Sequence, residues 1–127
     1  MRQNELKTED MLTYLFAIAK NNWPIYRIYP IFKELKEKFP KDKNLSEFLF
    51  YSIADSYHSR ELEGYLSCLV TYGTLYNNAS QFTHYFMTPQ TRKEELEELK
   101  RLPIQKQKQL RKIAKQLDKL VESGEKI

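Results

Sequence analysis

The sequence predicts a mainly α-helical fold with one small β-hairpin and an amphipathic C-terminal helix. Apolar residues recur at helical spacing in several segments, which are bounded by Pro, Gly or capping residues. Small polar residues around Asn77 separate two short runs of β-forming residues. The composition changes near Thr88, because all 17 aromatic residues precede it and the whole net charge of +4 follows it. We therefore expect a core over residues 1–88 and a helical extension over residues 89–127.

The length and composition fit a compact soluble domain. The chain has 127 residues, of which 41% are hydrophobic and 30% charged, so it is too apolar for a disordered chain and too charged for a membrane protein. Its longest nearly apolar run, Met11 to Ala19, is half the ~20 residues of a membrane-spanning helix. The first ten residues lack the apolar core of a signal peptide, and one Cys cannot form an intrachain disulfide. We expect a cytoplasmic protein that does not bind membranes.

Two helices are expected in the first 40 residues. The first begins at Thr8, which suits the N-cap position, and ends before Trp23-Pro24. A short extended stretch follows at 25–28. Pro30 suits the first position of the second helix, where its missing N–H costs nothing, and Pro40 ends that helix.

The third helix has the clearest helical spacing. Residues 45–53 fit both a strand and a helix, so extended or mixed structure is expected there. A polar turn then leads into the helix, with Ser56 or Ser59 as its N-cap. Gly73 lies where a left-handed C-terminal cap belongs. The buried stripe of this helix comprises Leu62, Tyr65, Leu66, Leu69 and Val70.

A β-hairpin and two more helices complete the chain. The hairpin has strands at 74–77 and 82–87, joined by a turn around Asn77-Asn78. The fourth helix begins at Thr88-Pro89, or at Thr91, where a capping box with Glu94 is possible. Pro103 breaks the chain. The fifth helix then spans about 104–122 and ends at Ser123-Gly124.

The order of these elements is that of a winged helix-turn-helix domain. The stretch FLFYSIADSYHSRELEGYLSCLVTYGTLYNN, residues 48–78, resembles a region of Panacea-type and related phage-associated winged-helix proteins. Residues 55–59 stand where those proteins have a Tyr-Gly-Pro-Tyr-Ser turn, and residues 71–75 where their helix ends in Leu-Gly-Leu-Ile. Residues 85–88 resemble the end of the wing strand. The resemblance covers residues 8–100 and implies gene regulation or an antitoxin-like role, without catalysis.

No catalytic, metal or cofactor site is expected. Asp55, His58 and Ser59 are hydrolase residue types, but neighbours in one turn rarely form a triad, and turn formation with helix capping is favoured. Neither His has metal-ligand spacing, and Cys68 is interpreted as a semi-buried thiol. The three Gly form no phosphate-binding pattern. We therefore predict that the chain is not an enzyme.

The third helix and the wing are the expected DNA-reading elements of a winged helix. The exposed positions of this third helix carry one Arg and two Glu, so its charge disfavours contact with phosphates. The wing offers hydrogen-bonding groups without charge. The candidate contacts are Arg60, Ser67 and Thr71 on the helix and Asn77, Asn78 and Gln81 on the wing.

The fifth helix is amphipathic and basic. Seven Lys/Arg and no Asp/Glu lie between Lys100 and Lys115. One side is an apolar stripe that dimerises or docks on its own domain, and the other side is either merely solvated or a phosphate-binding surface. Membrane binding is disfavoured because the apolar side lacks Trp and Phe. The stripe comprises Leu110, Ile113, Leu117 and Leu120, and the basic face comprises Lys108, Arg111, Lys112, Lys115 and Lys119.

Two functions are compatible with this pattern. The first is a homodimeric winged-helix regulator that binds double-stranded DNA and contacts its backbone through the basic fifth helix. The alternative is an antitoxin-like or adaptor protein, which uses the winged-helix scaffold to bind another protein. The nine Tyr support the alternative, because Tyr is enriched at protein interfaces.

Overall fold

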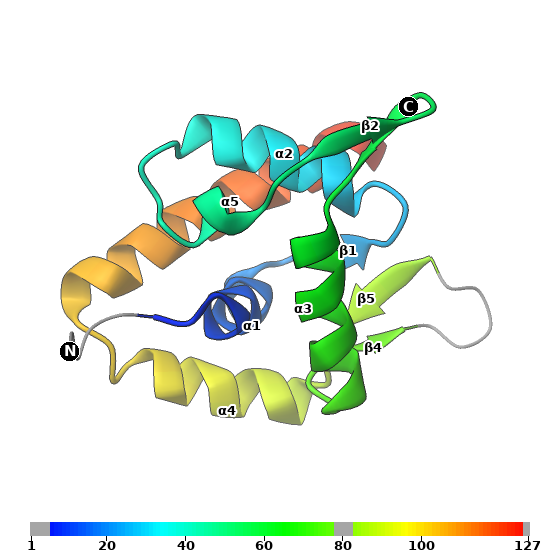
Figure 1. Cartoon of the computed structure of the whole chain (residues 1–127). Helices are drawn as coiled ribbons and strands as arrows, with labels where there is room; N and C mark the ends of the chain where they lie inside the picture. Colours follow the sequence, from blue (N-terminus) through cyan, green and yellow to red (C-terminus); the bar gives the residue numbers. More distant parts are fainter. Residues whose placement is uncertain (1–5, 78–82, 126–127) are drawn as a thin grey trace.

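The computed structural model describes residues 6–77 and 83–125 and is mainly helical, as predicted (Figure 1). A small antiparallel sheet and a separate two-stranded hairpin accompany the helices. The elements in chain order are α1 (Thr8–Ile18), β1 (Trp23–Pro24), α2 (Ile28–Lys38), the 3-10 helix η1 (Leu45–Glu47), β2 (Tyr51–Ile53), β3 (Ser56–His58), α3 (Arg60–Thr71), β4 (Tyr76–Asn77), β5 (His84–Phe86), α4 (Pro89–Leu99) and α5 (Ile104–Glu125).

One hydrophobic core joins the two compositional regions. Figure 1 shows α1 at the centre, with α4 on one side and α2 and α5 on the other, and α1 contacts both α4 and α5. Trp23 is fully buried between Phe16 and Phe32, with ring centroids 4.6 and 5.4 Å away. Six residues that follow Thr88 belong to the same core, namely Leu99, Leu110, Ile113, Ala114, Leu117 and Val121.

The predicted β-hairpin is present, with shorter strands than expected. β4 and β5 pair antiparallel with Tyr76 opposite Phe86, and those rings stack at 5.6 Å. β1 adds to the other edge of β5, which gives the strand order β1-β5-β4. The predicted turn residues Asn78 and Gln81 lie outside the described residues.

Three predicted helix boundaries are confirmed. Ser59 is the N-cap of α3, and its hydroxyl accepts a hydrogen bond from the Leu62 N–H. Gly73 follows the C-cap of α3 with a φ of +80°, the left-handed conformation that a residue without a Cβ adopts at little cost. Thr88 is the N-cap of α4 and Pro89 its first residue.

Three predicted boundaries were wrong. Lys7 is the N-cap of α1, because the Thr8 hydroxyl instead donates to Glu47 Oε2 at 2.7 Å. The helix α2 begins at Ile28, so Pro30 is its third residue, still within the first turn, where no backbone N–H is needed. The helix α5 continues through Ser123-Gly124, and the Arg27 guanidinium holds its last turn by donating to the Val121 carbonyl at 3.0 Å.

The segment after η1 forms a second hairpin that the sequence did not predict as such. Mixed structure was expected for residues 45–53, and the 3-10 helix followed by β2 confirms it. The polar turn expected next is instead the tip and returning strand of the hairpin, with Ile53 paired to Ser56 across Ala54-Asp55. Figure 1 shows this hairpin projecting beyond the helices. None of the helices in the described ranges is long and apolar enough to cross a membrane.

Candidate nucleic-acid interface

The apolar stripe of α5 is used within the chain. Leu110, Ile113 and Leu117 are fully buried, and Leu120 is partly buried against the same core. The helix packs on α1 and α2, so the stripe offers little surface to a second copy. Burial of this side fixes the rotation of α5 and points its opposite side toward solvent.

The basic face of α5 is a continuous exposed surface. All five of its side chains are exposed, and none forms an ion pair with an acidic side chain in the described ranges. Lys108 and Lys119 mark its ends, about 16 Å apart at the rise of an α-helix. The structure therefore brings Lys108, Arg111, Lys112, Lys115 and Lys119 together on one fixed helix side.

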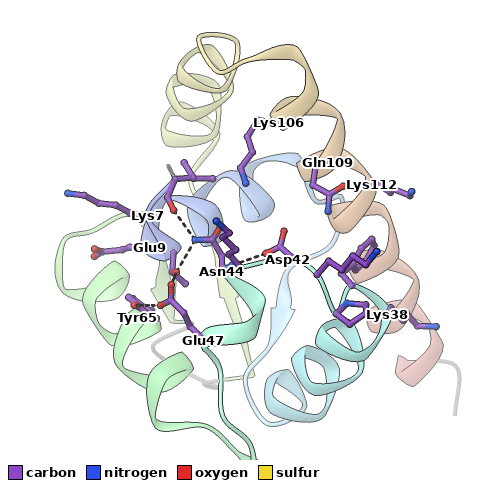
Figure 2. Close-up of a pocket in the computed structure, with 16 residues that line it drawn as sticks. Lys7, Glu9, Lys38, Asp42, Asn44, Glu47, Tyr65, Lys106, Gln109 and Lys112 are labelled. Atoms are coloured by element: carbon purple, nitrogen blue, oxygen red, sulfur yellow. Dashed lines mark hydrogen bonds between the residues drawn. The ribbon is translucent and has the colours of Figure 1, made fainter. Parts of the chain in front are cut away.

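A pocket of about 1310 Å³ adjoins this face (Figure 2). It lies between the start of α1, the segment from α2 to η1, and the first half of α5. Figure 2 shows Lys106 and Gln109 extending from α5 toward the pocket, whereas Lys7 points away from it. Its charged lining residues are Lys7, Lys38, Lys41, Lys43, Lys106 and Lys112 against Glu9, Asp42 and Glu47.

Two of the three pocket carboxylates are already engaged by the protein. Asp42 Oδ1 accepts hydrogen bonds from the N–H groups of Asn44 and Leu45, both at 3.0 Å. Glu47 accepts from Thr8 and, at 3.0 Å, from the Tyr65 hydroxyl, a bond that raises the pKa of Tyr65. The Asp42 bonds hold the start of η1, and the Glu47 bonds join η1 to α1 and α3.

The candidate contacts on α3 are exposed but lie in an acidic setting. Arg60, Ser67 and Thr71 do not line the pocket, and Glu63 is exposed beside them. The Arg60 guanidinium lies 6.0 Å from the Tyr51 ring centroid. Glu61 accepts a hydrogen bond from the Leu49 N–H, which lowers the pKa of its carboxyl. The exposed side of α3 therefore has the poor electrostatics for phosphate contact that its sequence predicts.

The wing contacts are described only in part. Asn77 is partly buried on β4, and its Oδ1 has no hydrogen-bond partner within the described ranges. Asn78 and Gln81 lie outside them. The described residues therefore give no position for the predicted wing tip.

The residues singled out for catalysis have other partners. Ser59 is fully buried as the N-cap of α3. The His58 ring contacts Glu63 instead, with 3.1 Å between Nε2 and Oε1. Cys68 is exposed, which corrects the expectation of a semi-buried thiol. The described residues contain no group of three or more His, Cys, Asp or Glu side chains that could hold a metal ion.

The pocket lysines after α2 were missed in the sequence. Lys38, Lys41 and Lys43 lie around Pro40, where the sequence predicts only the end of the second helix. The sequence shows these lysines as a local excess of positive charge. It does not show that they lie beside α5, because about 60 residues separate the two segments.

Comparison of the chain with known proteins identifies no relative. No family model, no curated protein and no solved structure matches it.

Proposed function

We propose that this chain is a small DNA-binding regulator of the winged-helix type, which contacts the duplex backbone through the basic face of α5. The observation that carries the proposal is that α5 holds five exposed cations on one helix side, none of them ion-paired to an acidic residue that the structure describes. The opposite side of α5 fills the core, so the cations need no ordering of the helix before they bind.

The element order supports the winged-helix part of the proposal. A helical pair precedes α3, and α3 leads directly into the β4–β5 hairpin. The strand order β1-β5-β4 lets the first strand close the sheet against the returning strand of that hairpin. The β2–β3 hairpin is then an insertion between α2 and α3.

In this proposal the affinity comes from phosphate neutralisation by α5. Each cation that neutralises a phosphate releases a counterion, so binding weakens as salt rises. Five such contacts give a slope of log K against log salt of about −4 to −5. The proposed base contacts remain Arg60, Ser67 and Thr71 of α3. Any preference for a DNA sequence comes from their hydrogen bonds to base edges, because phosphate contacts carry no sequence information.

The test is anisotropy titration of a random labelled duplex across a salt series. The wild type is compared with an Arg111→Glu/Lys115→Glu/Lys119→Glu variant, which leaves the pocket residue Lys112 in place. A Lys93→Glu/Lys100→Glu/Arg101→Glu variant on and just after α4 makes the same change in net charge. Loss of binding in the α5 variant alone supports the proposal. A wild-type slope near zero, or equal loss in both variants, overturns it.

A second candidate function is binding of another protein, and the β2–β3 hairpin favours it. Leu49, just before β2, is 62% exposed, and Tyr51, Ile53 and Tyr57 within the hairpin are 39%, 55% and 39% exposed. This is an unusual amount of apolar surface for one short segment. In an adaptor or antitoxin-like protein this surface meets the partner. Co-purification of a stoichiometric partner that Leu49→Ser/Ile53→Ser abolishes, and that the α5 variant retains, favours this candidate.

The expected homodimer stays a prediction. With Leu110, Ile113 and Leu117 buried inside one chain, a dimer needs a different surface from the α5 stripe. Light scattering on the wild type tests the oligomeric state directly.

A further inference from the structure

The positive charge of α5 continues into the pocket described above. Lys112 belongs both to the basic face and to the pocket lining, and Lys106 lies closer to the start of the same helix. Lys41 and Lys43 also line the pocket, from the segment after α2. The basic face and the pocket are therefore parts of one cationic surface.

Among the described residues, the pocket lining has more cations without an ion pair than carboxylates without a protein hydrogen bond. Lys41, Lys43, Lys106 and Lys112 form no ion pair with an acidic side chain in the described ranges. Lys38 Nζ lies 3.9 Å from Glu34 Oε2. Of the lining carboxylates, Asp42 and Glu47 already accept two protein hydrogen bonds each. A concave site with this balance concentrates anions.

We infer that this pocket binds phosphate groups. The ammonium groups of Lys41, Lys43 and Lys106 supply the charge, and the Gln109 amide supplies a neutral donor. Figure 2 shows the Gln109 side chain extending from α5 toward the pocket, where its amide N–H₂ can donate to a phosphate oxygen.

Two sources can deliver the phosphates. Continuity with α5 favours the backbone of the bound DNA, and this assignment rests on the proposed function. A free phosphate-bearing ligand has the same chemistry and would fill the pocket without DNA. The two sources differ in whether the pocket lysines contribute to the salt dependence of duplex binding.

The experiment uses a Lys41→Gln/Lys43→Gln/Lys106→Gln variant, which removes charge but keeps polarity. Its matched control is Lys20→Gln/Lys93→Gln/Lys100→Gln, with the same charge loss elsewhere. Both are titrated with sodium tripolyphosphate by calorimetry and with a random duplex across a salt series. We expect the pocket variant to weaken tripolyphosphate binding about fivefold or more and to make the duplex slope shallower by about 2 to 3. The control should change neither.

The outcomes separate this inference from the proposed function. Weaker duplex binding in the pocket variant, with or without weaker tripolyphosphate binding, places backbone phosphates in the pocket. Weaker tripolyphosphate binding alone identifies a free phosphate-bearing ligand, and this result stands even where the wild type fails to bind the duplex. Unchanged binding of both probes, or the same loss in the control, overturns the inference.

Discussion

Arg92 closes the C-terminal end of α1 from a neighbouring helix. Its Nη1 donates to the carbonyls of Phe16, Ala17 and Ala19 at 2.8, 2.8 and 3.0 Å. These carbonyls lack helical partners because the helix ends at Ile18. Asp118 of α5 accepts from the next N–H groups, those of Lys20 and Asn21. Where the chain leaves α1, the Arg92 cation thus satisfies the free carbonyls and the Asp118 anion satisfies the free N–H groups.

Replacing Arg92 by Met is expected to lower the free energy of unfolding by about 2–4 kcal/mol, because three partly buried carbonyls lose a charged donor. Met keeps an unbranched apolar side chain near the Phe16 ring, whose centroid lies 5.9 Å from the Arg92 guanidinium carbon. Urea denaturation measures the change. Lys93→Met, one residue along on the exposed side of α4, is the control and should stay within about 0.5 kcal/mol. An Arg92→Met variant as stable as the control would contradict this role.

Glu95 links stability to pH. Burial raises the pKa of its carboxyl, and the nearby carboxylates of Glu98 and Asp10 raise it further. The folded state therefore binds this proton more tightly than the unfolded state, so the contribution is favourable at low pH and is lost as pH rises through the folded pKa. Glu95→Gln should raise the melting temperature at pH 7, and the gain should vanish below about pH 4. Glu97→Gln, at an exposed position of the same helix, is the matched control; a Glu95→Gln gain that persists at low pH would exclude ionisation as its cause.

Local residue chemistry was predictable where the partner lies within a few positions in the sequence. Ser59, Thr88 and Gly73 act within one helical turn of their own backbone, and their roles followed from residue type. Thr8 is not the predicted cap, because its hydroxyl donates to Glu47 and accepts from the Asn44 amide, both almost 40 residues away in the sequence. Arg92 was equally hidden, since nothing near it in the sequence identifies the end of α1.

At the scale of an element, the β2–β3 hairpin turns at a residue in an unfavourable conformation. Ala54 has a φ of +55°, a region in which the Cβ of an L-residue clashes with its own backbone. It occupies the first position of the two-residue loop between Ile53 and Ser56, where Gly is preferred in turns of this kind. The predicted polar segment contains this two-residue turn, but the returning strand Ser56–His58 was missed because neither Gly nor Asn marks the turn.

Ala54→Gly should stabilise this hairpin by about 0.5–1 kcal/mol. This net value is the backbone strain that Gly relieves, reduced by the larger conformational entropy that Gly gives the unfolded chain. Hydrogen exchange of the Ser56 and Tyr57 amides reports on the hairpin more directly than global unfolding, because the tip projects from the core. Ala54→Val provides the opposite change, since a β-branched residue fits poorly at positive φ. Slower exchange in the Val variant than in the Gly variant would refute the assignment of strain to this position.

At the scale of the whole molecule, the division of charge and the division of structure differ. The sequence predicted a neutral aromatic core over residues 1–88 and a basic extension after it, and the charge division is real. Yet α5 packs on α1 and α2 and contributes to the one hydrophobic core. Composition shows where charge lies, so the candidate interface on α5 was predictable. Composition does not show which apolar stripe packs on which helix, so the continuation of the interface across the pocket was not predictable.

Removal of α5 is therefore expected to unfold the protein rather than leave a stable domain without its basic helix. A chain ending at Leu102 loses Leu110, Ile113, Ala114, Leu117 and Val121 from the core and exposes the facing sides of α1 and α2. The substitution Leu117→Ala, which empties one fully buried position, should already cost about 2–5 kcal/mol, a large part of the stability of a typical domain. Lys119→Ala, on the exposed side of the same helix, should stay within about 0.5 kcal/mol. Circular dichroism during thermal unfolding measures all three variants. A truncated chain that melts cooperatively near the wild-type temperature would show that residues 1–102 fold alone, and α5 would then be an appendage, as the composition first suggested.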